Sequence, residues 1–152
     1  MTDGDSAALR WRRRTLIGLI GAAVAVSVVH YADNTIRWDD FIAEDPGDRT
    51  LGWITRWMIP LSWLAFTACA ARGCQRFGQR RWPEAAAWLG AYSMSGLVGL
   101  AHYVDVPMAQ LSAFQNAHVL TDVILGAGVL AFAVHLAFRP PPHAHVDARP
   151  TT

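Results

Sequence analysis

The sequence predicts an all-α fold, a four-helix antiparallel transmembrane bundle with both termini cytoplasmic. Of the 152 residues, 53% are hydrophobic and only 16% are charged. The hydrophobic residues gather in four runs, residues 15–32, 51–71, 83–104 and 116–138. Each run approaches the roughly 20 residues with which a helix crosses about 30 Å of hydrocarbon. Inside lipid the backbone must satisfy its own hydrogen bonds, so each run is predicted to be a helix.

The arginines orient these four spans. All 13 basic residues are arginines, and two clusters adjoin the spans: Arg10, Arg12, Arg13, Arg14, Arg72, Arg76, Arg80 and Arg81. The loop at residues 33–50 is instead rich in acids. The positive-inside rule therefore predicts that both ends lie inside and the acidic loop outside. We expect a multi-pass protein of a bacterial inner (plasma) membrane. Because topology explains the arginines, we expect no nucleic-acid partner.

Residues 1–14 are predicted to form a basic cytoplasmic N-terminus ahead of the first span. His30 stands where signal-peptide cleavage requires a small residue, and three more spans follow, so we expect the first span to remain as an anchor. The acidic loop also contains Trp38 and Phe41. Acids mixed with large apolar residues are typical of a segment that lies on the membrane surface.

Prolines mark several boundaries along the rest of the chain. Pro60 falls in the first turns of the second span, where neighbouring groups can satisfy the freed carbonyl. Pro83 and Glu84 open the third span, because proline suits the first helical position and an acid stabilises the start of a helix. A short loop makes the third and fourth spans antiparallel neighbours. Three prolines open residues 139–152, which we expect to be a disordered cytoplasmic tail.

Small residues mark the helix faces that are predicted to pack, because helices in lipid associate through close contact. The predicted stripes are Ala23, Ser27 and His30 in the first span, Ala87, Ala91, Ser95 and Gly99 in the third, and His118, Asp122 and Gly126 in the fourth. Residues three or four apart share a helix face. The polar members of these stripes are therefore expected to face other helices.

Three pairs of histidine and aspartate form the candidate site. His30-Tyr31-Ala32-Asp33 and His102-Tyr103-Val104-Asp105 end the two outward spans, and His118 and Asp122 open the last span. All three pairs are predicted to lie near the outer face, with each aspartate bonded to the histidine of its own segment. A charge at mid-helix costs about 2.5–3.5 kcal/mol on insertion scales, so Asp122 in particular is expected to have a compensating partner.

Neutral imidazoles with carboxylates suit zinc, iron or copper. The predicted metal ligands are His30, His102, His118, Asp33, Asp105 and Asp122. The first hypothesis is a metal-dependent membrane enzyme or redox protein, with no catalytic residue assigned. The second is a non-catalytic bundle that binds lipid or assists other membrane subunits or a second copy of itself. The third is a b-type haem protein with two of the histidines as axial ligands.

Two further assignments accompany these hypotheses. In the haem hypothesis Gly99 and Gly126 would make room for the macrocycle. Arg56, at the outer mouth of the second span, is predicted either to reach lipid headgroups, or to pair with an aspartate, or to hold an anionic ligand such as a haem propionate. Membrane lipids are expected partners in every case.

Several short motifs also resemble those of small four-span bacterial membrane proteins that are known only as uncharacterised families. The motifs are His30-Tyr31-Ala32-Asp33-Asn34, the stretch from Tyr92 through Gly99-Leu100-Ala101-His102-Tyr103, and the third histidine in the last span. The resemblance covers the spans and the first loop. It implies four membrane spans and no particular activity.

Overall fold

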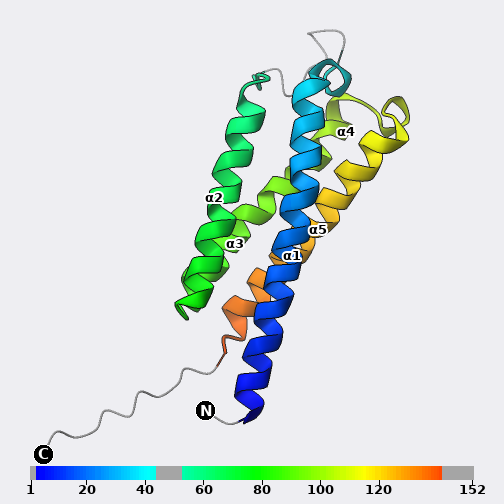
Figure 1. Ribbon diagram of the computed structural model, residues 1–152. Coiled ribbons are helices and arrows are strands. Elements are labelled where there is room, and N and C mark those ends of the chain that lie inside the picture. Colours follow the sequence, from blue (N-terminus) through cyan, green and yellow to red (C-terminus); the bar gives the residue numbers. More distant parts are fainter. Residues whose placement is uncertain (1–2, 44–52, 142–152) are drawn as a thin grey trace, which may run out of the picture.

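The computed structural model describes residues 3–43 and 53–141, and these residues form helices and no strand (Figure 1). The all-α prediction is therefore confirmed. The four long helices are α1 (Asp3–Ile36), α2 (Met58–Gly78), α3 (Trp82–Leu97) and α5 (Ala113–Phe138). The short ones are η1 (Trp38–Phe41), η3 (Val98–Ala101), α4 (His102–Asp105) and η4 (Met108–Gln110).

Two of the described helices are long and apolar enough to cross a membrane, at Ser6–Ile36 and Ala113–Phe138. The helix α2 has the 21 residues predicted for the second span but begins seven positions later in the sequence, and α3, with 16 residues, is shorter than the third predicted span. The third predicted span is divided, because α3 ends at Leu97 and the chain continues through the 3₁₀ helix η3 into α4. The predicted tail falls mostly on residues 142–152, outside the described residues.

The long helices run alternately up and down, so the start of α1 and the end of α5 lie at the same end of the bundle (Figure 1). The guanidinium of Arg12 donates to the carbonyl oxygen of Arg139 at 2.6 Å and joins these two ends. The opposite end carries η1 and η4 and is called the loop end below. At that end the Ser112 side chain and Gln115 form a capping box that fixes the first turn of α5.

Glycines allow α3 and α5 to approach closely. A Cβ added to Gly96 of α3 would overlap the backbone oxygen of Asp122 in α5, and one added to Gly126 would stand 2.9 Å from the Ser93 oxygen. The predicted stripe of α3 is partly wrong, because Ala87 and Ala91 are exposed. The face that packs carries Ala85, Ala86, Leu89, Ser93 and Gly96, since it must meet both α2 and α5.

The other two predicted stripes are confirmed. Ala23, Ser27 and His30 of α1 are buried, and so are His118, Asp122 and Gly126 of α5. An apolar core fills the bundle between these polar residues and the terminal end, and it includes Leu16, Leu89, Val129 and Leu136.

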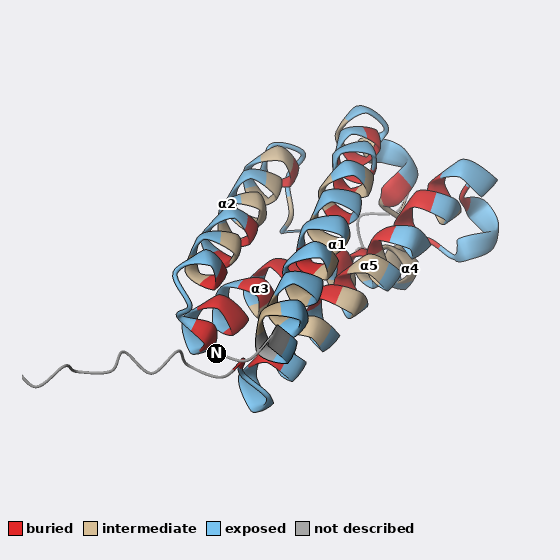
Figure 2. Ribbon diagram, turned by 60° about the horizontal axis from the view of Figure 1, so that its bottom comes forward, coloured by how far each residue is buried: buried red, intermediate tan, exposed pale blue. Residues whose placement is uncertain are grey.

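Large hydrophobic side chains cover the outside of the bundle. Exposed examples on the long helices are Ile17, Val28, Leu61, Leu64, Trp88, Met94, Ile124, Leu130 and Val134. Figure 2 shows exposed residues along the outward faces of the helices and buried ones between them. Several buried residues are polar instead, including Ser27, Asn34 and Ser93. A monomeric soluble protein rarely exposes so much continuous apolar surface.

Candidate functional site

Three imidazole rings meet inside the loop end of the bundle. The ring centroid of His30 in α1 lies 5.4 Å from that of His102 in α4 and 5.2 Å from that of His118 in α5. His30 and His118 are almost completely buried, at 2% and 6% exposure. These three residues are called the histidine cluster below. The sequence predicted that they would meet, and in the structure they do.

Each member of the cluster contacts a polar side chain from another helix. Nε2 of His118 donates to Oδ2 of Asp33 at 3.1 Å, and the Asn34 amide donates to Nε2 of His102 at 2.8 Å. Nδ1 of His30 lies 3.8 Å from Oδ2 of Asp122, which is longer than a hydrogen bond. The predicted pairing within each segment is therefore wrong for His30 and His118. The partners are exchanged between α1 and α5, because His30 faces Asp122 and His118 is bonded to Asp33.

Four buried polar atoms of this region have no hydrogen-bond partner. They are Nδ1 of His30, Nδ1 of His118, Oδ2 of Asp122 and Oδ1 of Asn34. Since His118 donates through Nε2, its Nδ1 carries a lone pair, and since Asn34 donates through its amide, its Oδ1 is an acceptor. Most of these four unpaired atoms are therefore hydrogen-bond acceptors. Buried polar groups are normally paired, so such a concentration requires an explanation.

The formal charge of the region is negative. Asp33 lies 3.3 Å from Nε of Arg37, one helical turn further along α1, and this arginine balances its charge. Asp122 is 2% exposed, and its only ion-pair contact within the described ranges 3–43 and 53–141 is with His30. With neutral imidazoles, the region therefore carries one uncompensated carboxylate, which favours a cation or a proton.

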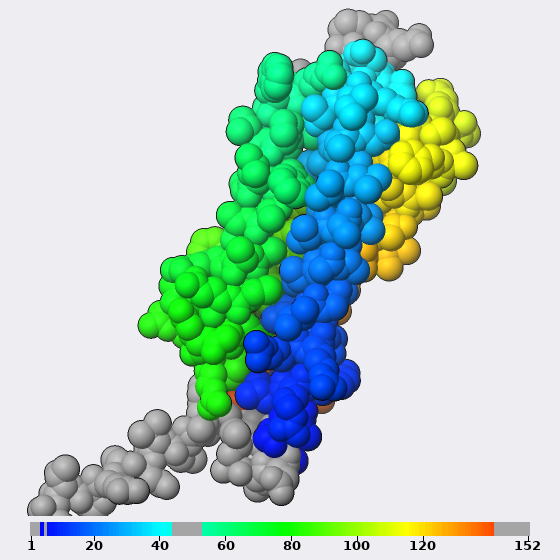
Figure 3. Space-filling model, in the orientation of Figure 1, coloured from blue at the N-terminus to red at the C-terminus, as the bar shows by residue number. Residues whose placement is uncertain are grey.

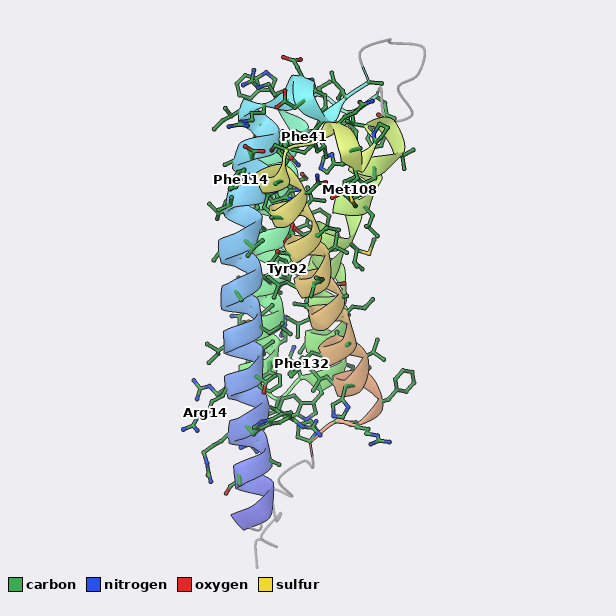
Figure 4. The ribbon with its side chains drawn as sticks, turned by 90° about the vertical axis from the view of Figure 1, so that its right-hand side faces the viewer. Arg14, Phe41, Tyr92, Met108, Phe114 and Phe132 are labelled. Carbon is green, nitrogen blue, oxygen red and sulfur yellow. The ribbon has the colours of Figure 1, made fainter. Side chains whose placement is uncertain are left out.

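Aromatic rings and buried hydroxyls enclose the histidine cluster. The Phe41 ring from η1 lies 4.8 Å from the His102 ring, and the Phe114 ring lies 5.1 Å from the His118 ring. Figure 4 labels both phenylalanines at the loop end. Below the cluster, the Tyr31 hydroxyl donates to the carbonyl oxygen of Ser95 at 3.2 Å. Tyr31, at 7% exposure, is therefore buried between the helices.

A cavity of about 220 Å³ adjoins the cluster on the side of α2. Its wall is mostly apolar and includes Phe41, Ile54, Ile59, Phe66, Val98 and Ala101. The polar part of the wall comes from His30, Asn34, His102, Tyr31, Ser62 and Asp105. His118 and Asp122 do not line it. The region thus has two parts, a buried acceptor-rich group on α1 and α5 and an apolar cavity beside it.

Two predicted site residues lie apart from the buried group. Asp105 lines the cavity and also an open hollow at the loop end, together with Asp39 and Asp40. Arg56 is exposed and donates to the carbonyl oxygen of Ile36 at 3.5 Å. It does not line the cavity, and among the described residues it forms no ion pair with the aspartates that were predicted as its partners.

Sequence analysis missed Asn34 and Phe41 as parts of the site. The signal for Asn34 was its spacing of four from His30, which puts both on one helix face. That signal depends on α1 continuing to Ile36, four residues beyond the predicted end of the span. Phe41 gave only a weaker signal, an apolar residue in an acidic loop, because its burial depends on contacts with distant residues.

A metal ion and haem fit the region to different degrees. Within residues 3–43 and 53–141, no group of three or more His, Cys, Asp or Glu side chains is arranged so that it could hold a metal ion. The ring separations nevertheless match the roughly 5 Å expected for two imidazoles on one tetrahedral ion with bonds of about 2.0–2.1 Å. Haem fits poorly, because α3 occupies the space beside Gly126, and the side chains of His30 and Val123 occupy the space beside Gly99.

Known proteins do not assign the region a role. No protein-family model, no curated protein and no solved structure matches the chain. The interpretation therefore rests on the geometry of the described residues.

Proposed function

We propose that the chain is a four-span integral membrane protein with both termini cytoplasmic, and that its buried His/Asp group binds one transition-metal dication. Support for membrane embedding comes from the apolar outer surface, together with the polar side chains that are buried between the helices at the loop end. In this arrangement α2 and the α3–η3–α4 segment are the second and third spans. The helix α3 has only 16 residues, and α2 ends in charged and polar residues, including Arg72, Gln75 and Arg76.

The topology has a direct test. Cys69 and Cys74 are replaced by serine, and a single cysteine is introduced at Asp40 or at Ser6. In intact cells a membrane-impermeant thiol reagent should label position 40 and should reach position 6 only after permeabilisation. Labelling of position 6 in intact cells would overturn the proposed orientation.

The observation that carries the metal proposal is the set of unpaired acceptors around an uncompensated carboxylate. Nδ1 of His118, Nδ1 of His30 and Oδ2 of Asp122 are all buried and without hydrogen-bond partners. Mixed nitrogen and oxygen donors of this kind suit zinc, iron or copper. Asp33 already holds the His118 ring through Nε2, which is how outer carboxylates orient metal-bound histidines.

Binding requires the three side chains to move closer together, because they are not yet gathered around one point. Nδ1 of His30 and Oδ2 of Asp122 are 3.8 Å apart, against roughly 3.3 Å for two ligands of an ideal tetrahedral ion. Small changes in side-chain rotamer would close that difference. Metal binding should therefore also stabilise the fold, because it ties α1 to α5.

The metal experiment uses the full chain in detergent, stripped with a chelator and then incubated with Zn²⁺ or Co²⁺. Elemental analysis after removal of free ion should give about one ion per chain. His118→Ala and Asp122→Asn should each reduce this to background. The matched control is His135→Ala, because His135 also belongs to α5 but is exposed.

A second candidate is a cofactor-free bundle in which a proton bound by His30 or by Asp122 compensates the buried charge. The 3.8 Å contact between these two residues favours it. In this case the folded protein takes up no metal above the level of the Asp122→Asn variant, and its thermal unfolding is the same with and without Zn²⁺. Those results would overturn the metal proposal.

A further inference from the structure

An open hollow at the loop end leads toward the buried His/Asp group. It has a volume of about 960 Å³ and is called the acidic hollow below, because its described lining includes Asp39, Asp40 and Asp105 and a single basic residue, Arg37. Asp39, Asp40 and Arg37 are exposed, whereas Gln115 of α5, which forms another part of the wall, is only 3% exposed. The acidic hollow therefore reaches from the surface to the buried face of α5.

Two polar stripes continue inward from the acidic hollow. The stripe of α1 contains Arg37, Asp33 and His30, and that of α5 contains Gln115, His118 and Asp122. The members of each stripe are three or four residues apart, and this spacing keeps side chains on one helix face. Figure 3 shows the loop end of α1 directly against the start of α5. Because seven residues of helix span about 10 Å, the stripes cover that distance between the acidic hollow and the buried group.

The two stripes are joined by a series of contacts, which is called the polar ladder below. At the rim, Nε2 of Gln115 donates to Oδ2 of Asp40 at 2.9 Å. The next contact is the hydrogen bond from His118 to Asp33, and the deepest is the contact between two ligands of the proposed metal site. A series of polar groups thus connects the surface with that site, between α1 and α5.

The other described approaches to the buried group are closed or mostly apolar. Toward the terminal end, the bundle is filled by the core that includes Leu16 and Val129. On the side of α3, Gly96 lies against the backbone of Asp122. The cavity on the side of α2 has a mostly apolar wall, and neither His118 nor Asp122 lines it. A dication that leaves water needs new polar partners, so the polar ladder is the favoured path.

The Asp33 carboxylate closes the polar ladder at its middle contact. Oδ2 accepts from Nε2 of His118 at 3.1 Å, and Oδ1 lies 3.3 Å from Nε of Arg37. Both oxygens are therefore engaged, and an ion can pass only when Asp33 moves away from His118. The Arg37 side chain is 52% exposed and holds Asp33 from the side of the acidic hollow. Arg37 is thus placed to oppose that movement.

We propose that the metal ion enters from the acidic hollow along the polar ladder, and that Asp33, held by Arg37, is the gate of this route. This inference rests on the proposed metal site and adds how the ion reaches it. The excess of carboxylates in the acidic hollow raises the local concentration of cations, which speeds association.

The route is tested on the full chain in detergent, with Cys69 and Cys74 replaced by serine. Gln110→Cys in the acidic hollow is labelled with a methanethiosulfonate reagent that carries either a trimethylammonium or a sulfonate group. Stopped-flow absorbance measures Co²⁺ uptake at about 0.15 M salt, where charges act over only about 8 Å. The cationic label should slow association about threefold relative to the anionic label, because it repels the ion. Met58→Cys, at the exposed edge of the apolar cavity, is the matched control, and its two labels should give equal rates.

The outcomes of this experiment separate the route from the site. Equal rates for the two labels at position 110 would overturn the route, and so would a larger difference at position 58 than at position 110. Both comparisons are made within one variant, so a folding defect cannot produce them. Failure of the unlabelled protein to take up Co²⁺ would instead overturn the metal site itself.

Arg37→Gln tests the gate through two rates. Association of Co²⁺ and its release into excess chelator should both become faster by about threefold, the factor expected for the loss of one partly exposed ion pair. Loss of the positive charge alone would speed association and slow release, and a loosened ligand set would speed release alone. Either of these patterns, or unchanged rates, would overturn the gate. Arg37→Lys, which keeps a positive charge near Asp33, should restore rates close to those of the unsubstituted protein.

Discussion

Two helix interfaces of the bundle are built in opposite ways. Between α3 and α5, Gly96 and Gly126 bring the backbones into contact, and no lipid-sized space remains. Between α1 and α2, at the loop end, the helices enclose one hollow and border the cavity beside it. A side-chain hydrogen bond between α1 and α2 runs from Nε1 of Trp63 to Oγ of Ser27, at 3.1 Å.

The difference shows that one interface of the bundle supplies stability, whereas another leaves space beside the histidine cluster. Lipid tails are as apolar as leucine, so close packing of small residues is what holds membrane helices together. The α3–α5 interface supplies that packing and also positions Asp122, whose backbone touches Gly96. The α1–α2 interface is less tightly packed and leaves space next to the histidine cluster. Binding regions are commonly drawn from such less stable parts of a protein.

The largest predicted effect breaks the tight interface. In Gly96→Ala the new methyl group overlaps the Asp122 carbonyl, which is backbone and cannot move aside. Overpacking of this kind costs about 1–3 kcal/mol of unfolding free energy. Titration with a denaturing detergent, followed by circular dichroism, measures the change.

Gly90→Ala is the matched control in the same helix, because nothing lies within 4 Å of the added Cβ. Alanine is the better helix former by about 1 kcal/mol in water, so this variant should be neutral or slightly stabilising. Equal destabilisation by both substitutions would mean that α3 and α5 do not meet at Gly96.

A smaller effect is expected at the loose interface. Trp63→Phe removes the hydrogen bond to Ser27, and hydrogen bonds between membrane helices contribute about 0.6 kcal/mol on average. The same detergent titration should therefore show a loss well below that of Gly96→Ala. Trp57→Phe is the control, because Trp57 is 75% exposed. A loss of unfolding free energy larger than that of Gly96→Ala would show that α1 and α2 are the tightly held pair.

The sequence predicted the helical class and most of the buried polar residues. The stripes in α1 and α5 are confirmed because both helices are regular, so spacing of three or four residues translates directly into a common face. The α3 stripe was partly wrong. This helix packs against α2 on one side and α5 on another, and a single ladder of small residues could not represent two contact faces.

The partners of the site residues were less predictable. A local rule assigns each aspartate to the histidine of its own turn, and it failed for His30 and His118. The orientation of His102 was also beyond local spacing, because η3 turns each residue by about 120° where an α-helix turns it by about 100°. Over the four residues of η3 this difference rotates His102 by roughly 80°.

The sequence by itself determined that the chain is helical, which faces of α1 and α5 are buried, and that His30, His102 and His118 come from one end of three helices. These properties follow from the hydrophobic pattern and the helix period, both of which are local. Only the tertiary structure decided which carboxylate faces which imidazole, which atoms remain unpaired, and that a cavity opens beside Asn34. Those properties depend on the distances between helices from distant parts of the chain. The spacing of residues along the sequence gives no information about these distances.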